Sequence, residues 1–166
     1  MRLSLLLLAM LTGCTSLQMA PYRTSGGKAP VRTVAGYTQS RSFVLKWPVN
    51  NARMTRGFSP YRKNHYGIDL AKGFGEPIYA AHDGKVVYVG NKYRGFGKLI
   101  IIEHPNGWGS LYAHNSKILV HENDWVEVGQ RIALMGQTGN ARGVHLHFEL
   151  RDKKKAVDPV LHLPKL

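Results

Sequence analysis

The chain has 166 residues, which is enough for one domain and a short targeting segment but too few for two sizeable hydrophobic cores. It carries 23 lysines and arginines against 10 aspartates and glutamates, a formal net charge of +13, so an anionic surrounding is expected. Its single cysteine, Cys14, excludes an intrachain disulfide framework.

The first thirteen residues have the pattern of a secretory signal. Arg2 precedes an apolar run over residues 3–10. Such a run suits a signal-peptide core of roughly 7–15 residues and is too short for a spanning helix of about 20. We therefore expect residues 1–13 to be a signal peptide that is removed on export.

The segment Leu11-Thr12-Gly13-Cys14 directly follows this run and resembles the bacterial lipobox. The resemblance implies that Cys14 is diacylated and becomes the mature N-terminus, and two or more acyl chains anchor a protein stably to a membrane. Because Thr15 rather than aspartate comes next, lipoprotein sorting favours an outer-membrane address facing the periplasm. A spare thiol beside a cleaved signal is the alternative for Cys14.

Residues 14–41 are expected to form a lipidated flexible tether, because they are rich in Ser, Thr, Gly, Pro and Arg and show no helical or strand periodicity. Residues 42–166 then remain as the folded domain.

Nucleic acid is the usual partner of so basic a chain, but an exported, lipid-anchored protein rarely meets it. We therefore expect that the chain does not bind nucleic acid and that its partners are cell-wall polymers or lipid phosphates. A basic surface that only keeps the protein soluble is the alternative.

From Phe43 onward, short apolar runs bounded by turn residues predict β-strands. Such runs cover residues 86–89 after Asp83-Gly84, residues 99–102 before Pro105-Asn106-Gly107, and residues 132–135 before Gly136. The run over residues 99–102 lacks alternation, which is typical of a strand buried on both faces. Few segments show helical periodicity, so any helix should be short. The domain is therefore predicted to be mainly β and antiparallel.

Two histidines in the segment Val144-His145-Leu146-His147-Phe148 are the strongest functional signal. Side chains alternate along a strand, so His145 and His147 project to one face while their apolar neighbours can face a core. A catalytic zinc takes three protein ligands, His nitrogens or carboxylate oxygens among them, and leaves one position for water. Together with His65, Asp69 and His114, these histidines can supply such a set and leave two imidazoles for acid/base work.

Three motifs carry a family resemblance: His65-Tyr66-Gly67-Ile68-Asp69, Tyr112-Ala113-His114 and His145-Leu146-His147-Phe148-Glu149. In this order they look like the signatures of the LytM-type, lysostaphin-like peptidoglycan metallopeptidases of family M23. The match runs over about residues 57–161. The resemblance implies an antiparallel β-sandwich-like domain with a central groove.

The resemblance also implies roles for the site residues. His65, Asp69 and His147 would bind one zinc ion per domain. His114 and His145 would activate water and stabilise the transition state. The implied activity is a zinc-dependent endopeptidase that hydrolyses peptide cross-links or stems of peptidoglycan, in cell-wall remodelling and daughter-cell separation. A D-alanyl–diaminopimelate cross-link is the first choice of bond and a glycyl bond the second.

Other polar residues have plainer interpretations. Glu149 shares the strand face of His145 and His147 and can accept a hydrogen bond that orients one of them, although a surface carboxylate is the default. The four remaining histidines are interpreted as turn or surface residues: His82, His104, His121 and His162. A closed structural zinc site is the weaker interpretation, because it would need four protein ligands.

Residues 97–104 and 112–115 are also similar to the LytM-like lipoproteins of the NlpD type. Members of that subgroup activate cell-wall amidases without cutting anything themselves, and they characteristically lack some zinc ligands. This sequence retains each ligand, which favours the enzyme. A non-catalytic activator, with a cell-wall amidase or the division machinery as its partner, is the alternative.

Overall fold

The computed structural model describes residue 43 and residues 45–165 of the chain. The predicted signal segment 1–13, Cys14 and the tether 14–41 lie outside these residues, so their assignments stay predictions. Within the described part of the chain, no helix is long and apolar enough to cross a membrane.

Short strands make up most of the domain, as the turn-punctuated sequence predicts. The larger sheet is built from β1 (Arg53–Arg56), β2 (Ile68–Ala71), β4 (Gly84–Gly90), β5 (Leu99–Glu103), β6 (Trp108–Ala113), β8 (Trp125–Val126), β10 (Leu146–Asp152) and β11 (Lys155–Val157). The smaller sheet is built from β3 (Pro77–Tyr79), β7 (Lys117–Ile118) and β9 (Arg131–Leu134). Helical structure is limited to α1 (Pro60–Lys63) and the 3₁₀ turns η1 (Pro105–Gly107) and η2 (Pro159–Leu161) among the described residues.

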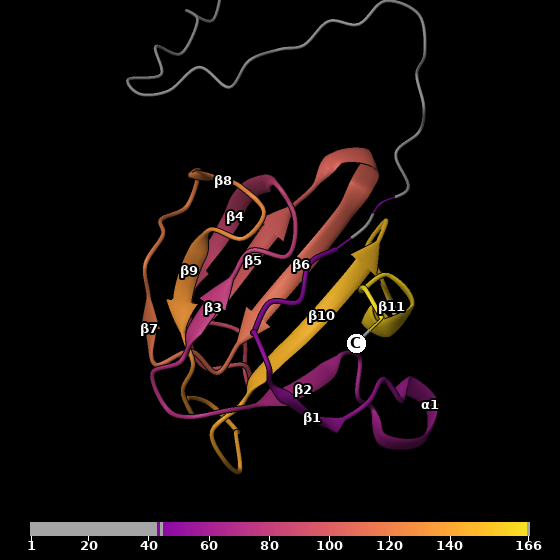
Figure 1. Ribbon diagram of the computed structural model, residues 1–166, viewed down its shortest axis with the longest axis vertical. Helices are drawn as coiled ribbons and strands as arrows, with labels where there is room; N and C mark the ends of the chain where they lie inside the picture. The colour runs from indigo at the N-terminus through magenta and orange to yellow at the C-terminus, as the bar shows by residue number, and fades with distance from the viewer. Residues whose placement is uncertain (1–42, 44, 166) are drawn as a thin grey trace, which may run out of the picture. The chain divides into compact units, whose positions relative to one another are not determined.

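The larger sheet has the strand order β1-β2-β10-β6-β5-β4-β8, with β11 also paired to β10, and the smaller sheet has the order β3-β9-β7. Every pairing is antiparallel. Figure 1 shows β10 running between β6 on one side and β2 on the other. The predicted antiparallel β fold is confirmed, and β2, β10 and β6, which carry the three motifs, are direct neighbours.

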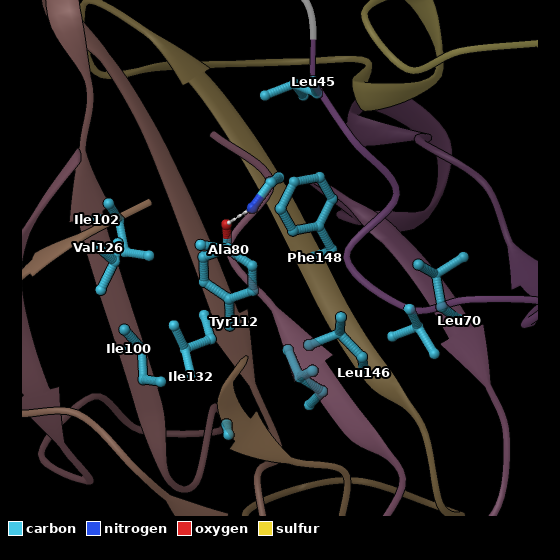
Figure 2. Close-up of a cluster of buried hydrophobic side chains, with 14 of the residues drawn as sticks. Leu45, Leu70, Ala80, Ile100, Ile102, Tyr112, Val126, Ile132, Leu146 and Phe148 are labelled. Carbon is cyan, nitrogen blue, oxygen red and sulfur yellow. Dashed lines mark hydrogen bonds between the residues drawn. The ribbon is translucent and has the colours of Figure 1, made fainter. Parts of the chain in front are cut away.

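One hydrophobic core joins the two sheets. It contains Ile78 of β3 and Ile132 of β9 together with apolar side chains of β4, β5, β6 and β10. Figure 2 shows Tyr112 of β6 beside Phe148 of β10, with ring centroids 5.3 Å apart. Leu146, Phe148 and Leu150 are fully buried, as the strand alternation predicts. This inward set directs the residues between them, including His147 and Glu149, to the other face of β10.

The unbroken apolar run of β5 is covered on both faces, as predicted. Ile100 and Ile102 join the core between the sheets, while Leu99 belongs to a second buried cluster on the opposite face with Leu111 and Ala113. Residues of a strand that is covered on both sides have no solvated face to alternate with. The strand therefore forms a firm support for β6 and the start of the Tyr112-Ala113-His114 motif.

His104 is interpreted from the sequence as a turn or surface residue, and the structure shows that it is not on the surface. Its side chain is buried, Nδ1 donates to the Asp83 carbonyl oxygen at 2.8 Å, and Nε2 lies 2.8 Å from Oγ of Ser110. Ser110 is in turn hydrogen-bonded to the Tyr112 hydroxyl at 2.9 Å. Burial lowers the pKa of His104 to about 4 and keeps the imidazole neutral.

Candidate metal centre

The antiparallel register places the predicted ligands next to one another. Asp69 of β2 lies directly opposite His147 of β10, and His147 lies opposite Ala113 of β6 on its other side. Directly opposed residues on adjacent strands project to the same face with Cβ atoms roughly 4.5–5.5 Å apart. The pairing of three strands therefore brings Asp69, His147 and the following His114 to one end of the sheet.

His65 reaches the same place through a tight local turn. The short helix α1 begins at a proline and is followed by Asn64, whose left-handed conformation (φ 47°, ψ 41°) asparagine tolerates better than most residues. His65 then forms an isolated β-bridge with Ser59. Its Nδ1 donates to the carbonyl oxygen of Gly57 at 2.8 Å, which leaves Nε2 as the ring nitrogen that faces Asp69.

The glycine of the His65-Tyr66-Gly67-Ile68-Asp69 motif is required by close packing. A Cβ atom at Gly67 would overlap the carbonyl oxygen of Phe148 on β10. Only glycine lets the chain entering β2 approach β10 so closely. Gly67 thus sets the distance between the strands that carry Asp69 and His147.

Three donor atoms converge at this point. Nε2 of His65 lies 2.9 Å from Oδ1 of Asp69, Nδ1 of His147 lies 2.8 Å from the same oxygen, and the two nitrogens are 3.2 Å apart. Bonds of about 2.0–2.1 Å in a tetrahedron separate donor atoms by about 3.3 Å. Two imidazole nitrogens and one carboxylate oxygen at these separations fit a zinc ion with little movement.

The interpretation of Glu149 as a surface carboxylate is wrong. The geometry matches the alternative, a carboxylate that accepts a hydrogen bond and orients one of the histidines. Glu149 is 2% exposed, and its Oε1 accepts a hydrogen bond from Nε2 of His147 at 3.2 Å. Its other oxygen, Oε2, accepts from Nε and Nη2 of Arg151 at 3.0 and 2.6 Å. This carboxylate holds a proton of His147 on Nε2 and leaves Nδ1 as the ring nitrogen that faces the site.

The two remaining histidines stand beside the three donors and are anchored in the same way. Nδ1 of His114 lies 2.8 Å from the carbonyl oxygen of Thr138, and Nδ1 of His145 lies 2.9 Å from that of Gly143. Their ring centroids are 4.7 Å apart, and Nε2 of His145 is 3.8 Å from Oδ1 of Asp69. Because each Nδ1 donates its proton to a carbonyl, Nε2 is the ring atom that remains for proton transfer or hydrogen bonding in the site.

His114 is held in an unusual backbone conformation. Its φ of 66° lies in the left-handed region, which is costly for a side chain with a Cβ. Neighbouring loops maintain it: its amide donates to the Phe96 carbonyl at 2.9 Å, and its carbonyl accepts from the Thr138 amide at 3.4 Å. This turn at the end of β6 directs the imidazole towards His145.

The charges in the site are strongly coupled. Burial opposes ionisation of Asp69, but hydrogen bonds and charge from His147 and His65 outweigh it and lower the pKa of the carboxyl to about 2. Burial likewise disfavours the cationic form of His147, yet Asp69 and Glu149 outweigh it and raise the pKa to about 9. Burial, together with His145 and His147, lowers the pKa of His114. The metal-free centre therefore holds a proton on His147 where a cation would bind.

The five side chains line a groove with a volume of about 790 Å³. One wall is formed by the end of β1 and by α1, including Arg56 and Lys63; the other comes from two loops that contain Arg94 and Arg142. The predicted groove is thus present and passes over the donor atoms.

Sequence reasoning did not identify the carbonyl groups that orient the histidines, or these loop residues. Glycines around residues 95–97 and 139–143 indicate loops, but nothing local shows that two loops distant in sequence meet over one site. The sequence also did not identify Phe96, whose ring centroid lies 5.9 Å from that of His147.

The fold is an antiparallel β domain, and its three converging donors, His65, Asp69 and His147, could hold one metal ion in an open groove. Residues 63–159 match the model of "Peptidase family M23", and the chain belongs to this family. It is 39% identical over 151 residues to outer membrane antigenic lipoprotein B of Haemophilus influenzae, an alignment that covers 91% of this chain and 37% of that protein. The family resemblance drawn from the three motifs is confirmed.

Two further proteins extend the comparison. The chain is 44% identical over 120 residues to murein hydrolase activator NlpD of Escherichia coli K12, covering 72% of this chain and 31% of that protein. It thus spans only about a third of the length of these curated relatives. The crystal structure of a zinc-containing peptidase from Vibrio cholerae superposes with a TM-score of 0.66 at 38% identity, covering 71% of this chain and 39% of that one.

Proposed function

We propose that this domain is a zinc-dependent endopeptidase that hydrolyses peptide cross-links or stems of bacterial peptidoglycan. The observation that carries the proposal is the convergence of His65, Asp69 and His147 in an open groove, with the imidazoles of His114 and His145 beside them. A structural zinc site takes four protein donors. Three donors in a groove instead support a catalytic centre.

Zinc in such a site supplies Lewis acidity, which polarises a carbonyl group and makes water more acidic. The chain's own residues supply proton transfer and hydrogen bonding. One imidazole of the pair His114 and His145 accepts a proton from the attacking water at Nε2, and the other, when protonated on Nε2, donates a hydrogen bond to the oxygen on which charge develops. Their anchored Nδ1 atoms fix both rings, so neither reorients during the reaction.

Glu149 contributes to the same centre through its hydrogen bond with His147. By accepting the Nε2 proton of His147 it holds that ring in the tautomer that a metal requires. Arg151 neutralises the buried carboxylate from its other side. This arrangement supports tight binding of one ion by the domain.

A second candidate function rests on the relatives rather than on the site. A protein named murein hydrolase activator is 44% identical to this chain, which supports a role as a non-catalytic activator of cell-wall amidases, with the division machinery as a further partner. The complete donor set favours the enzyme. Incubation of purified peptidoglycan with the chain alone, and with the chain and an added amidase, distinguishes the two functions.

We also propose that the chain is a lipoprotein of the cell envelope, anchored through Cys14 in the outer membrane and facing the periplasm. The lipobox-like segment supports this, as do relatives named as lipoproteins. Cys14→Ser should abolish labelling by radioactive fatty acid and release the chain from the membrane fraction. Label retained by Cys14→Ser would contradict the proposal.

The site assignment is tested by comparing two neighbouring histidines. His147→Ala should lose zinc, because two remaining donors hold the ion poorly. His145→Ala should retain zinc and lose about 10²–10⁴-fold in cleavage rate, the typical contribution of acid/base catalysis. Metal analysis and a wall-digestion assay on both variants check this. Equal zinc in wild type and His147→Ala would show that the ligand set is wrong, and loss of zinc from His145→Ala would show that the two roles are reversed.

A further inference from the structure

The groove is lined by four cationic side chains, two on each wall: Arg56, Lys63, Arg94 and Arg142. All four are exposed, and none forms a salt bridge within residues 45–165. Asp69, which is committed to the metal centre, is the one carboxylate among the lining residues. Four like charges around one groove repel one another, so an anionic ligand there gains from all of them.

One cationic wall is built from interlocked loops. The amide of Asn140 donates to the Gly95 carbonyl at 2.9 Å, and the amide of Lys98 donates to Oγ1 of Thr138 at 3.0 Å. Gly97 and Gly139 pack so closely that a Cβ on either would overlap the other loop. The loops that carry Arg94 and Arg142 are therefore fixed to each other, and both side chains start from a rigid base.

The opposite wall is tied directly to the metal centre. Arg56 is the register partner of Asp69 in the β1–β2 pair, so it stands one strand away from a proposed ligand. Its Nη2 donates to the carbonyl oxygen of Lys63 at 3.0 Å, which joins the end of β1 to the end of α1. Part of the guanidinium and the whole ammonium group of Lys63 remain for a ligand.

We propose that these four side chains select substrates that carry free carboxylates beside the scissile bond. This inference rests on the proposed endopeptidase function and names its substrate class. An arginine guanidinium binds a carboxylate through two parallel hydrogen bonds, which favours such a group over a neutral amide of the same shape. In a diaminopimelate-type cross-link, the acylated amine sits on a carbon that also bears a free carboxylate, whereas a glycyl cross-link has none there. The basic groove therefore favours the former.

The test compares two cross-linked peptide dimers that differ only in whether the diaminopimelate carboxylate is free or amidated. The zinc-loaded full chain should cleave the free dimer with a kcat/KM roughly ten- to a hundredfold higher, the range of one charge-assisted hydrogen bond. Arg94→Ala/Arg142→Ala should lose most of this preference through KM while keeping its zinc. Arg62→Ala is the matched control, because Arg62 is exposed on α1 but does not line the groove.

A binding measurement separates this inference from the proposed function. Dissociation constants of both dimers are measured on the zinc-loaded His145→Ala chain, in which cleavage is slow. Tighter binding of the free dimer supports the inference even if wild type cuts neither dimer, an outcome that would refute only the endopeptidase. Equal cleavage and equal binding of the two dimers would overturn the inference and leave the endopeptidase intact. Binding of an acidic helical peptide with no preference between the dimers would also overturn it, and would assign the basic groove to a protein partner.

Discussion

Nε2 of His147 donates to Oε1 of Glu149 at 3.2 Å, although the two residues are separated by only one position on β10. Strand alternation brings both side chains to the same face. Burial raises the pKa of Glu149, but hydrogen bonds from His147 and Arg151 outweigh it and lower the pKa overall, so these two residues keep the carboxylate charged. The carboxylate thereby fixes which nitrogen of His147 faces Asp69.

Glu149→Gln should weaken zinc binding by about 10–100-fold, the usual cost of removing the carboxylate behind a metal-binding imidazole. The amide keeps the size of the side chain but removes the negative charge that orients His147. Competition with a chelator measures the change in dissociation constant. Glu103→Gln, an exposed position on β5, is the control and should bind zinc like wild type. An unchanged constant in Glu149→Gln would mean that the hydrogen bond does not act on the metal.

Zinc binding at pH 7 should release about one proton from His147. The pKa of this imidazole is about 9 in the metal-free centre because Asp69 and Glu149 outweigh the effect of burial, and a metal ligand must be deprotonated. Titration calorimetry in buffers of different ionisation enthalpy counts the released protons. Heats that are identical in all buffers would contradict the protonated state of His147.

Gly67→Ala should destabilise the domain and also weaken zinc binding, because the new methyl group would force β2 away from Phe148. Overpacking of this kind costs about 1–3 kcal/mol. Denaturant unfolding measures the loss, and Gly73→Ala is the control, since its Cβ would meet Glu76 only at ordinary contact distance. Equal stability of the two variants would show that the close approach is not required.

The burial of His104 predicts how the stability of the domain depends on pH. Its pKa is about 4 in the folded domain against about 6.5 unfolded, so the unfolded chain binds more protons between these values. The neutral imidazole contributes on the order of 3 kcal/mol to the free energy of unfolding above pH 6.5, and this contribution is lost as the pH falls towards 4. Unfolding at several pH values should show a smaller loss for His104→Gln than for wild type. Parallel pH profiles of the two proteins would refute the assignment.

Residue alternation was sufficient to predict much of the centre. The pattern of residues 144–148 put His145 and His147 on one face and Leu146 and Phe148 in the core, and the motif order indicated the family. Those inferences depend on neighbours along one strand. The metal and catalytic roles of the five residues stay predictions.

Features that depend on distant partners could not be predicted. His104 is buried because Ser110 and the Asp83 carbonyl satisfy its ring nitrogens, and neither partner is marked by a local pattern. The strands of the smaller sheet have only two to four residues, too few to show a period. The basic groove likewise forms only when loops from separate parts of the chain pack together.

The central claim is that this chain itself cuts peptide bonds in peptidoglycan. Mass spectrometry of purified sacculi, incubated with the zinc-loaded chain and no amidase, tests it most directly. We expect cross-linked peptides to be converted to products with new peptide ends, with the glycan–peptide linkage intact, and no such products from zinc-loaded His145→Ala. Unchanged sacculi in the presence of zinc-bound wild-type protein, together with peptide release from glycan once an amidase is added, would contradict the enzyme and establish the activator.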